Sequence, residues 1–197
     1  MRLILSSPNP RICSYSTDAG QVFYKASKSG ISGSSVVALR KAVNDDHFAL
    51  YAEVEYHTSR STRFRFQNRD VSVDNHFRKE GGFDSRWVFI AADNREYYWN
   101  FDGRYLEMFR NYRTKKVVVR YREHKGLFGP FITRRPASLE VHDTCVPILD
   151  DIVMTYVYCQ NQRKQRQASR IRITDVLDCA SVVMDCLSNG DCTDGDG

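Results

Sequence analysis

The chain has 197 residues, a hydrophobic content of 42% and a formal net charge of +5. This length and apolar content suffice for the core of one ordinary domain, so the composition excludes a wholly disordered protein. The six cysteines show no CxxC and no regular spacing, and disulfide-dense scaffolds are usually shorter and richer in cysteine, so we expect reduced thiols. The start, "MRLILSSPNP", has too short an apolar run for a secretory signal, so we expect none.

Residues 1 to 145 contain short apolar segments with the periodicity of strands. In "FALYAEVEYH" the apolar residues alternate with Glu53 and Glu55, and in "TRFRFQ" Phe64 and Phe66 alternate with arginines. Alternation with a period of two is typical of a strand with one buried face. Further strand-like segments are "RLIL", "QVFYK", "SVVAL", "DVSV", "RWVFIA", "EYYWN", "RYLEMF", "KVVVRYR" and "SLEV". Turn sequences separate many of them, which predicts a mainly β, antiparallel body of about twelve strands.

A helix is predicted next, from about Leu149 to Gln167, with Asp150 and Asp151 near the positive end of its dipole. Its middle, "IVMTYVYC", is apolar on every side, and a helix of this kind is buried on every side. The eight apolar residues span ~12 Å at ~1.5 Å each. A bilayer core requires about 20 apolar residues, so we predict no transmembrane span.

An eleven-stranded barrel can hold a central helix. We therefore predict a closed antiparallel β-barrel around this helix, with Ile152, Val153, Tyr156 and Val157 in the core.

A second helical pattern, "ITDVLDCASVVMDCL", follows. Its apolar residues recur on one face at helical spacing, and its acidic residues fall mostly on the other. The final residues, "SNGDCTDGDG", have no periodicity. We predict a barrel domain over 1–168, a short amphipathic helix over 169–187 and a disordered acidic tail over 188–197. The amphipathic helix packs on the barrel, which we favour, or binds a protein partner through residues 171–187.

Three segments resemble a family of unknown function found in basidiomycete fungi: "HFRKEGGFDSRWVFIAADNREYYW", "GPFITRRPASLEV" and "ILDDIVMTYVYCQNQRKQRQ". The resemblance covers roughly residues 1 to 168. That family is similar to the Tubby C-terminal-like superfamily, with the phospholipid scramblases and the LURP-one-related proteins. The resemblance implies a closed barrel around a hydrophobic helix. Tubby domains bind phosphoinositide head groups through basic side chains, but no local motif transfers those side chains to this sequence.

Motifs of known enzymes and metal sites are missing from the sequence. The five histidines are dispersed, and there is no HExxH, GxSxG or P-loop. The Ser/Gly-rich "SGISGSS" has no lysine to contact a phosphate, and Cys179 and Cys186 have no histidine nearby to complete a metal site. We therefore expect a non-enzymatic protein with no catalytic residues, no metal and no cofactor.

Basic residues provide the functional hypothesis. Beyond Arg172 the sequence contains six aspartates and no cation, so residues 1–172 hold 29 basic and 18 acidic side chains, a net charge of +11. In "RNYRTKKVVVRYREHK" the alternation places several cations on one side of a strand. Arginine suits bidentate contact with phosphate. The predicted anion-binding residues are Arg113, Lys115, Lys116, Arg120 and Arg122, with Arg63 and Arg65 on another strand. The alternative is that these charges only provide solubility and protect sheet edges.

The ligand class follows from where the aromatic residues lie. Surfaces that bind single-stranded nucleic acid place exposed aromatic rings among cations for stacking. Here the aromatic residues alternate with the cations and are expected in the core, which favours acidic phospholipid at a membrane surface over RNA. A protein-interaction module and a weak RNA binder are the alternative functions. We expect a cytoplasmic protein, with a peripheral-membrane or nuclear location as the alternatives.

Overall fold

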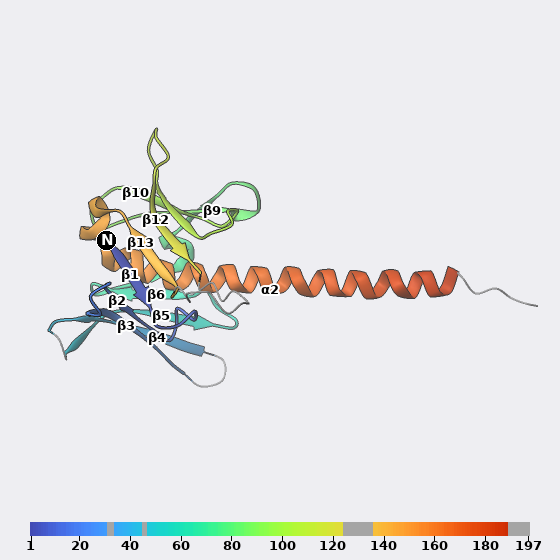
Figure 1. Cartoon of the computed structure of the whole chain (residues 1–197), viewed down its shortest axis with the longest axis horizontal. Helices are drawn as coiled ribbons and strands as arrows, with labels where there is room; N and C mark the ends of the chain where they lie inside the picture. The colour runs from blue at the N-terminus through green and yellow to red at the C-terminus, as the bar shows by residue number, and fades with distance from the viewer. Residues whose placement is uncertain (31–33, 45–46, 124–135, 189–197) are drawn as a thin grey trace, which may run out of the picture. The chain divides into compact units, whose positions relative to one another are not determined.

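The computed structural model describes residues 1–30, 34–44, 47–123 and 136–188 (Figure 1). The side chains of residues 84 and 170–188 are outside this description. The chain divides into two units, Met1–Asn161 and Gln162–Gly197. The tail predicted over 188–197 lies almost wholly outside the described residues.

The described residues of the first unit form one sheet of 13 strands. They are β1 (Arg2–Leu5), β2 (Cys13–Ser16), β3 (Val22–Ser29), β4 (Ser34–Ala42), β5 (Phe48–His57), β6 (Arg63–Phe66), β7 (Arg69–Ser72), β8 (Arg78–Glu80), β9 (Arg86–Ile90), β10 (Glu96–Asn100), β11 (Glu107–Arg110), β12 (Val117–Arg122) and β13 (Ser138–Val141). The helices are α1 (Val73–His76), η1 (Gly82–Asp84), η2 (Asp143–Ile148) and α2 (Leu149–Ser188). The predicted mainly β, antiparallel class is therefore confirmed. All eleven segments named from the sequence are strands, and β2 and β8 are additional.

The strand order is β7-β6-β5-β4-β3-β2-β1-β13-β12-β11-β10-β9-β8, and neighbouring strands pair antiparallel throughout. The first strand thus lies beside the last one. The predicted closure is not confirmed, because β7 and β8 are both edges of the sheet and share no ladder of hydrogen bonds. The short helix α1 connects these two edges.

The alternation expected in β5 is interrupted by a bulge. Leu39 pairs with Ala52, but the next residue of β4, Arg40, pairs with Leu50, so Tyr51 is the extra residue. A bulge reverses the faces of the residues beyond it. Leu50, predicted on the apolar face, is consequently 54% exposed, whereas the ring of Tyr51 packs against the core.

The first turns of α2 are the core of this unit. Ile152, Val153, Tyr156 and Val157 are fully buried, as predicted. Strands lie on opposite sides of these turns in Figure 1, with β9, β10, β12 and β13 on one side and β2 to β6 on the other. The ring contacts agree, since the ring of Tyr156 lies near the rings of Tyr15 in β2, Trp99 in β10 and Tyr121 in β12.

The prediction of two helices after residue 148 was wrong, because α2 is one continuous helix from Leu149 to Ser188. The intervening sequence, "QRQASRIR", contains neither glycine nor proline and consists mostly of residues that favour helices, so nothing in it ends the helix. The apolar face predicted over residues 171–187 consists of side chains that lie outside the described part of the structure. No helix among the described residues is both long enough and apolar enough to cross a membrane.

Candidate functional site

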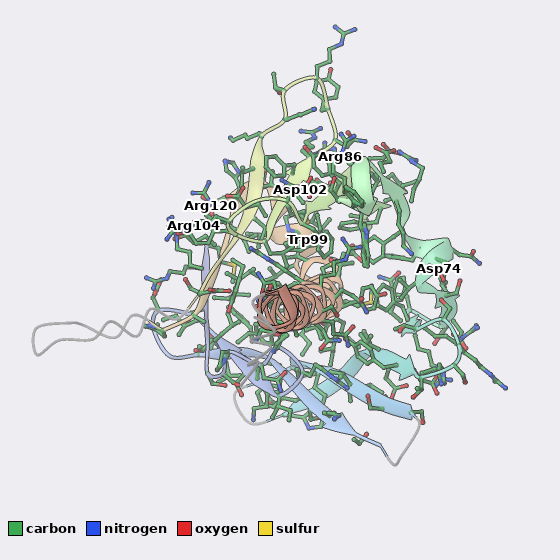
Figure 2. All side chains as sticks on the ribbon, turned by 90° about the vertical axis from the view of Figure 1, so that its right-hand side faces the viewer. Asp74, Arg86, Trp99, Asp102, Arg104 and Arg120 are labelled. Carbon is green, nitrogen blue, oxygen red and sulfur yellow. The ribbon has the colours of Figure 1, made fainter. Side chains whose placement is uncertain are left out.

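The seven cations predicted from the sequence lie in two places on the sheet. Arg113, Lys115 and Lys116 lie in the connection between β11 and β12, and Arg120 and Arg122 lie in β12. Arg63 and Arg65 belong to β6, and six strands separate β6 from β12 in the sheet order. The two groups therefore do not form one surface. Figure 2 shows Arg120 on the outer side of the sheet, whereas Trp99 lies on the side that faces the helix.

The two arginines of β12 are paired with glutamates on the neighbouring strands. The Nε of Arg120 donates to the Oε1 of Glu107 at 2.5 Å, and the Nε of Arg122 donates to the Oε1 of Glu140 at 2.6 Å. The bond to Glu140 raises the pKa of Arg122 above its ordinary value. Both arginines project outward, but a carboxylate already balances each charge. They are therefore weaker candidates for binding an external anion.

The arginines of β6 are paired in the same way. The Nε of Arg63 donates to the Oδ1 of Asp70 at 2.6 Å, and Arg65 forms an ion pair of 2.7 Å with Glu55. The hydrogen bond from Arg63 lowers the pKa of the Asp70 carboxyl. These pairs lie at the surface, where ion pairs contribute little to stability. Their main effect is to reduce the positive charge that β6 presents.

Residues 111–116, which we call the hairpin tip, differ from β6 and β12 because two of their cations have no carboxylate partner among the described residues. The side chains of Arg113 and Lys115 are exposed, and no described carboxylate lies within ion-pair distance of either cation. Lys116 donates through its Nζ to the Nε2 of His142 at 2.9 Å. The tip projects beyond the rest of the sheet, as the yellow-green loop at the top of Figure 1 shows. It thus presents two cations that remain available to an anion.

An aromatic side chain accompanies these cations. Tyr112 is 63% exposed, and the guanidinium of Arg110 lies over its ring at 5.7 Å from the centroid. The base of the tip is anchored, because the side-chain amide of Asn111 donates to Glu96 Oε2 at 2.8 Å and its backbone N–H donates to the Glu96 carbonyl at 2.9 Å. The sequence prediction missed Tyr112, since aromatic residues were assigned to the core. Its position in a turn among four cations was the available signal.

The described residues contain no group of three or more His, Cys, Asp or Glu side chains arranged to hold a metal ion. The thiols of Cys13, Cys145 and Cys159 are buried. Burial raises the pKa of the Cys13 thiol. A buried thiol with a raised pKa is a poor nucleophile.

A family model matches residues 8–165. The match includes the first turns of α2 and every described strand except β1. Neither a curated protein nor a solved structure matches the chain. The likeness to the Tubby, LURP-one-related and scramblase proteins thus finds no support among relatives and stays a hypothesis. The match extends over most of the chain, and the protein belongs to DUF6593, a family of unknown function.

Proposed function

We propose that this protein is a non-enzymatic binding domain that attaches to acidic phospholipid surfaces through the hairpin tip. The observation behind the proposal is the state of Arg113 and Lys115, which are exposed, near the end of a projecting hairpin and without a described carboxylate partner. A cation near an acidic leaflet contributes ~1 kcal/mol to binding. The proposed location is accordingly cytoplasmic or peripheral to a membrane.

The composition of the tip also supports a membrane surface. Tyrosine side chains favour the boundary between water and lipid, where the ring meets the acyl chains and the hydroxyl stays hydrated. Tyr112 is the one large apolar or aromatic side chain of the tip, and it is mostly exposed. We further propose that α1 completes the wall between β7 and β8, so that the strands form a barrel of the Tubby-like kind around the first turns of α2.

Flotation with lipid vesicles tests this function. We expect the wild-type protein to bind vesicles that contain phosphatidylserine and to bind pure phosphatidylcholine vesicles weakly. Changing Arg113→Gln and Lys115→Gln together removes ~2 kcal/mol and should weaken binding by about tenfold or more. Binding should also fall as the salt concentration rises, because exposed charges are screened.

The matched control is Arg120→Gln together with Arg122→Gln. It removes the same number of positive charges, but from arginines that Glu107 and Glu140 already balance. This control should bind nearly as the wild type does. Equal losses in both double variants would refute the tip as the site. Wild-type protein that binds RNA but not acidic vesicles at low salt would favour the nucleic-acid alternative, and binding to neither would reject the proposal.

A further inference from the structure

A pocket of about 490 Å³ opens where the sheet is not closed. Its walls are the β6–β7 hairpin, α1 and the turn after β9, and Asp151 of α2 also lines it. We call it the seam pocket. Its volume lies in the range of small-molecule sites, which is about 300–1,000 Å³. Asp74 in Figure 2 marks α1, on the opposite side of the first unit from Arg104 and Arg120. None of the residues that line the seam pocket belongs to the hairpin tip, so the pocket is separate from the proposed lipid site.

Asp151 is a buried carboxylate without a cation. It is 8% exposed, and its Oδ2 accepts one hydrogen bond of 2.8 Å from the backbone N–H of Ala92. No described lysine or arginine lies within ion-pair distance of it. The neighbouring carboxylates are better balanced, since Asp150 pairs with Lys41 at 2.9 Å and Asp93 pairs with Arg95 at 3.8 Å.

A buried, unpaired carboxylate costs free energy in the folded protein. Burial raises the pKa of the Asp151 carboxyl, and the charges of Asp150 and Asp93 raise it further. Buried charges in proteins are normally paired or bound to metals, because desolvation is costly. Asp151 therefore has the electrostatic character of half an ion pair, and the missing half is a cation.

The histidine of the pocket wall does not supply that charge. His76 lines the pocket. Its ring makes edge-on contacts with the rings of Phe64, Phe66 and Phe77. It also stacks on the ring of Phe89. Its Nε2 is buried and has no hydrogen-bond partner among the residues that the structure describes. Burial lowers the pKa of His76 to about 4, so the ring is neutral at physiological pH. His76 therefore supplies no positive charge to Asp151.

The remaining wall suits the hydrocarbon part of a ligand. Phe66 and Ile90 both line the pocket, and Ile90 is 62% exposed although it is large and apolar. A phenyl face attracts a cation as well as hydrocarbon. Arg69 also lines the pocket but has an exposed side chain, so it lies toward solvent. The pocket thus combines an inner carboxylate with an aromatic and aliphatic wall.

We propose that the seam pocket binds a small organic ammonium ion, with the charged group at the Asp151 carboxylate and the hydrocarbon along Phe66 and Ile90. Both requirements come from the pocket itself. A positive charge balances the unpaired carboxylate, and an apolar chain covers the partly buried ring of Phe66 and the exposed side chain of Ile90. This binding does not depend on the hairpin tip. It adds a ligand class that the proposed membrane function does not require.

Titration with n-butylammonium tests the proposal, and n-butanol serves as the neutral ligand of similar shape. The amide resonance of Ala92 reports on the site, because this N–H donates to Asp151. We expect a saturable shift with butylammonium at a Kd of about 1 mM, and binding of butanol weaker by at least about tenfold. Asp151→Asn should reduce the affinity for butylammonium by about tenfold or more while leaving that for butanol nearly unchanged.

Asp150→Asn is the matched control, since it changes the adjacent carboxylate that Lys41 and Tyr24 already engage. We expect this variant to bind butylammonium within about threefold of the wild type. Arg69→Gln should bind it at least as tightly, because a competing cation is removed from the pocket. Equal binding of butanol and butylammonium, an unchanged affinity in Asp151→Asn, or no saturable shift at Ala92 in the wild type would overturn the proposal. Circular dichroism confirms that each variant is folded.

Discussion

Trp99 of β10 and Thr155 of α2 are joined by a hydrogen bond of 3.0 Å, in which the indole N–H donates to the threonine hydroxyl oxygen. Both residues are completely buried. The hydroxyl in turn donates to the carbonyl of Asp151, one helical turn earlier, at 2.7 Å. A side-chain hydrogen bond inside an otherwise apolar core fixes the rotation of the helix, because other rotations would leave the indole N–H unsatisfied.

Replacing Thr155 by valine should therefore destabilise the first unit by about 1–3 kcal/mol, since the Trp99 N–H would lose its acceptor without reaching water. Thr155→Ser keeps the hydroxyl and loses one methyl group, so its cost should be smaller, at ~1 kcal/mol. Urea unfolding followed by tryptophan fluorescence measures both values. A valine variant as stable as the serine variant would show that the hydrogen bond does not contribute.

Val153→Asp tests whether α2 is the core. Val153 is fully buried, and an unpaired charge at such a position costs several kcal/mol. We expect this variant to be unfolded or to melt far below the wild type. Val153→Ala, which only removes methyl groups, should fold and melt moderately lower. Thermal melting by circular dichroism distinguishes these results, and an unchanged melting temperature for Val153→Asp would contradict the position of the helix.

His76 should make stability depend on pH. Its pKa is about 4 in the folded protein and 6.5 in an unfolded chain, so between these values the unfolded state binds the extra proton. Stability attributable to this residue is complete above pH 6.5 and decreases as the pH falls toward 4, by about 3 kcal/mol in total. Urea unfolding at a series of pH values measures the slope.

His76→Phe should reduce that slope, because a phenyl ring fits among the surrounding aromatic rings and does not titrate. Replacing an exposed histidine, as in His47→Gln, is the control and should leave the slope unchanged. A slope that persists in His76→Phe would assign the pH dependence to other groups.

Asp151→Asn should stabilise the protein at neutral pH when no ligand is bound. The pKa of Asp151 is raised, so the folded state holds this proton more tightly than the unfolded state, and stability decreases as pH rises through the folded pKa. Asparagine is neutral and still offers a carbonyl oxygen to the Ala92 N–H. We expect a melting temperature a few degrees above the wild type at pH 8, and a smaller difference near pH 4. A lower melting temperature at pH 8 would show that the carboxylate stabilises the fold.

Local patterns in the sequence were enough to predict the strands and the buried helix. The alternation around Phe64 and the mostly apolar, uncharged run from Ile152 to Cys159 both reflect side chains that contact the same core, so each can be recognised within a few residues. The strands β2 and β8 were not predicted, because "CSYS" and "RKE" contain too few apolar residues to show a period of two.

Features that depend on pairing between distant segments could not be predicted in this way. Whether Arg120 is available to a ligand depends on Glu107 across the hairpin, and the availability of Arg63 depends on Asp70 in the neighbouring strand. Strand register decides such contacts, and a single bulge changes it. The seam pocket is a stronger case, since Asp151 appeared in the sequence only as a favourable residue at a helix start, and nothing local associates it with the strand edges.

The order of the chain also affects how the protein is made. β1 pairs with β13, and the helical turns that fill the core follow every strand in the sequence. A ribosome therefore releases all thirteen strands before the residues that bury their apolar faces emerge. Contacts between residues so far apart form slowly, and exposed strands on a nascent chain are prone to aggregate. We expect folding to begin only after residue 161 has left the exit tunnel, and synthesis to require protection by chaperones until then.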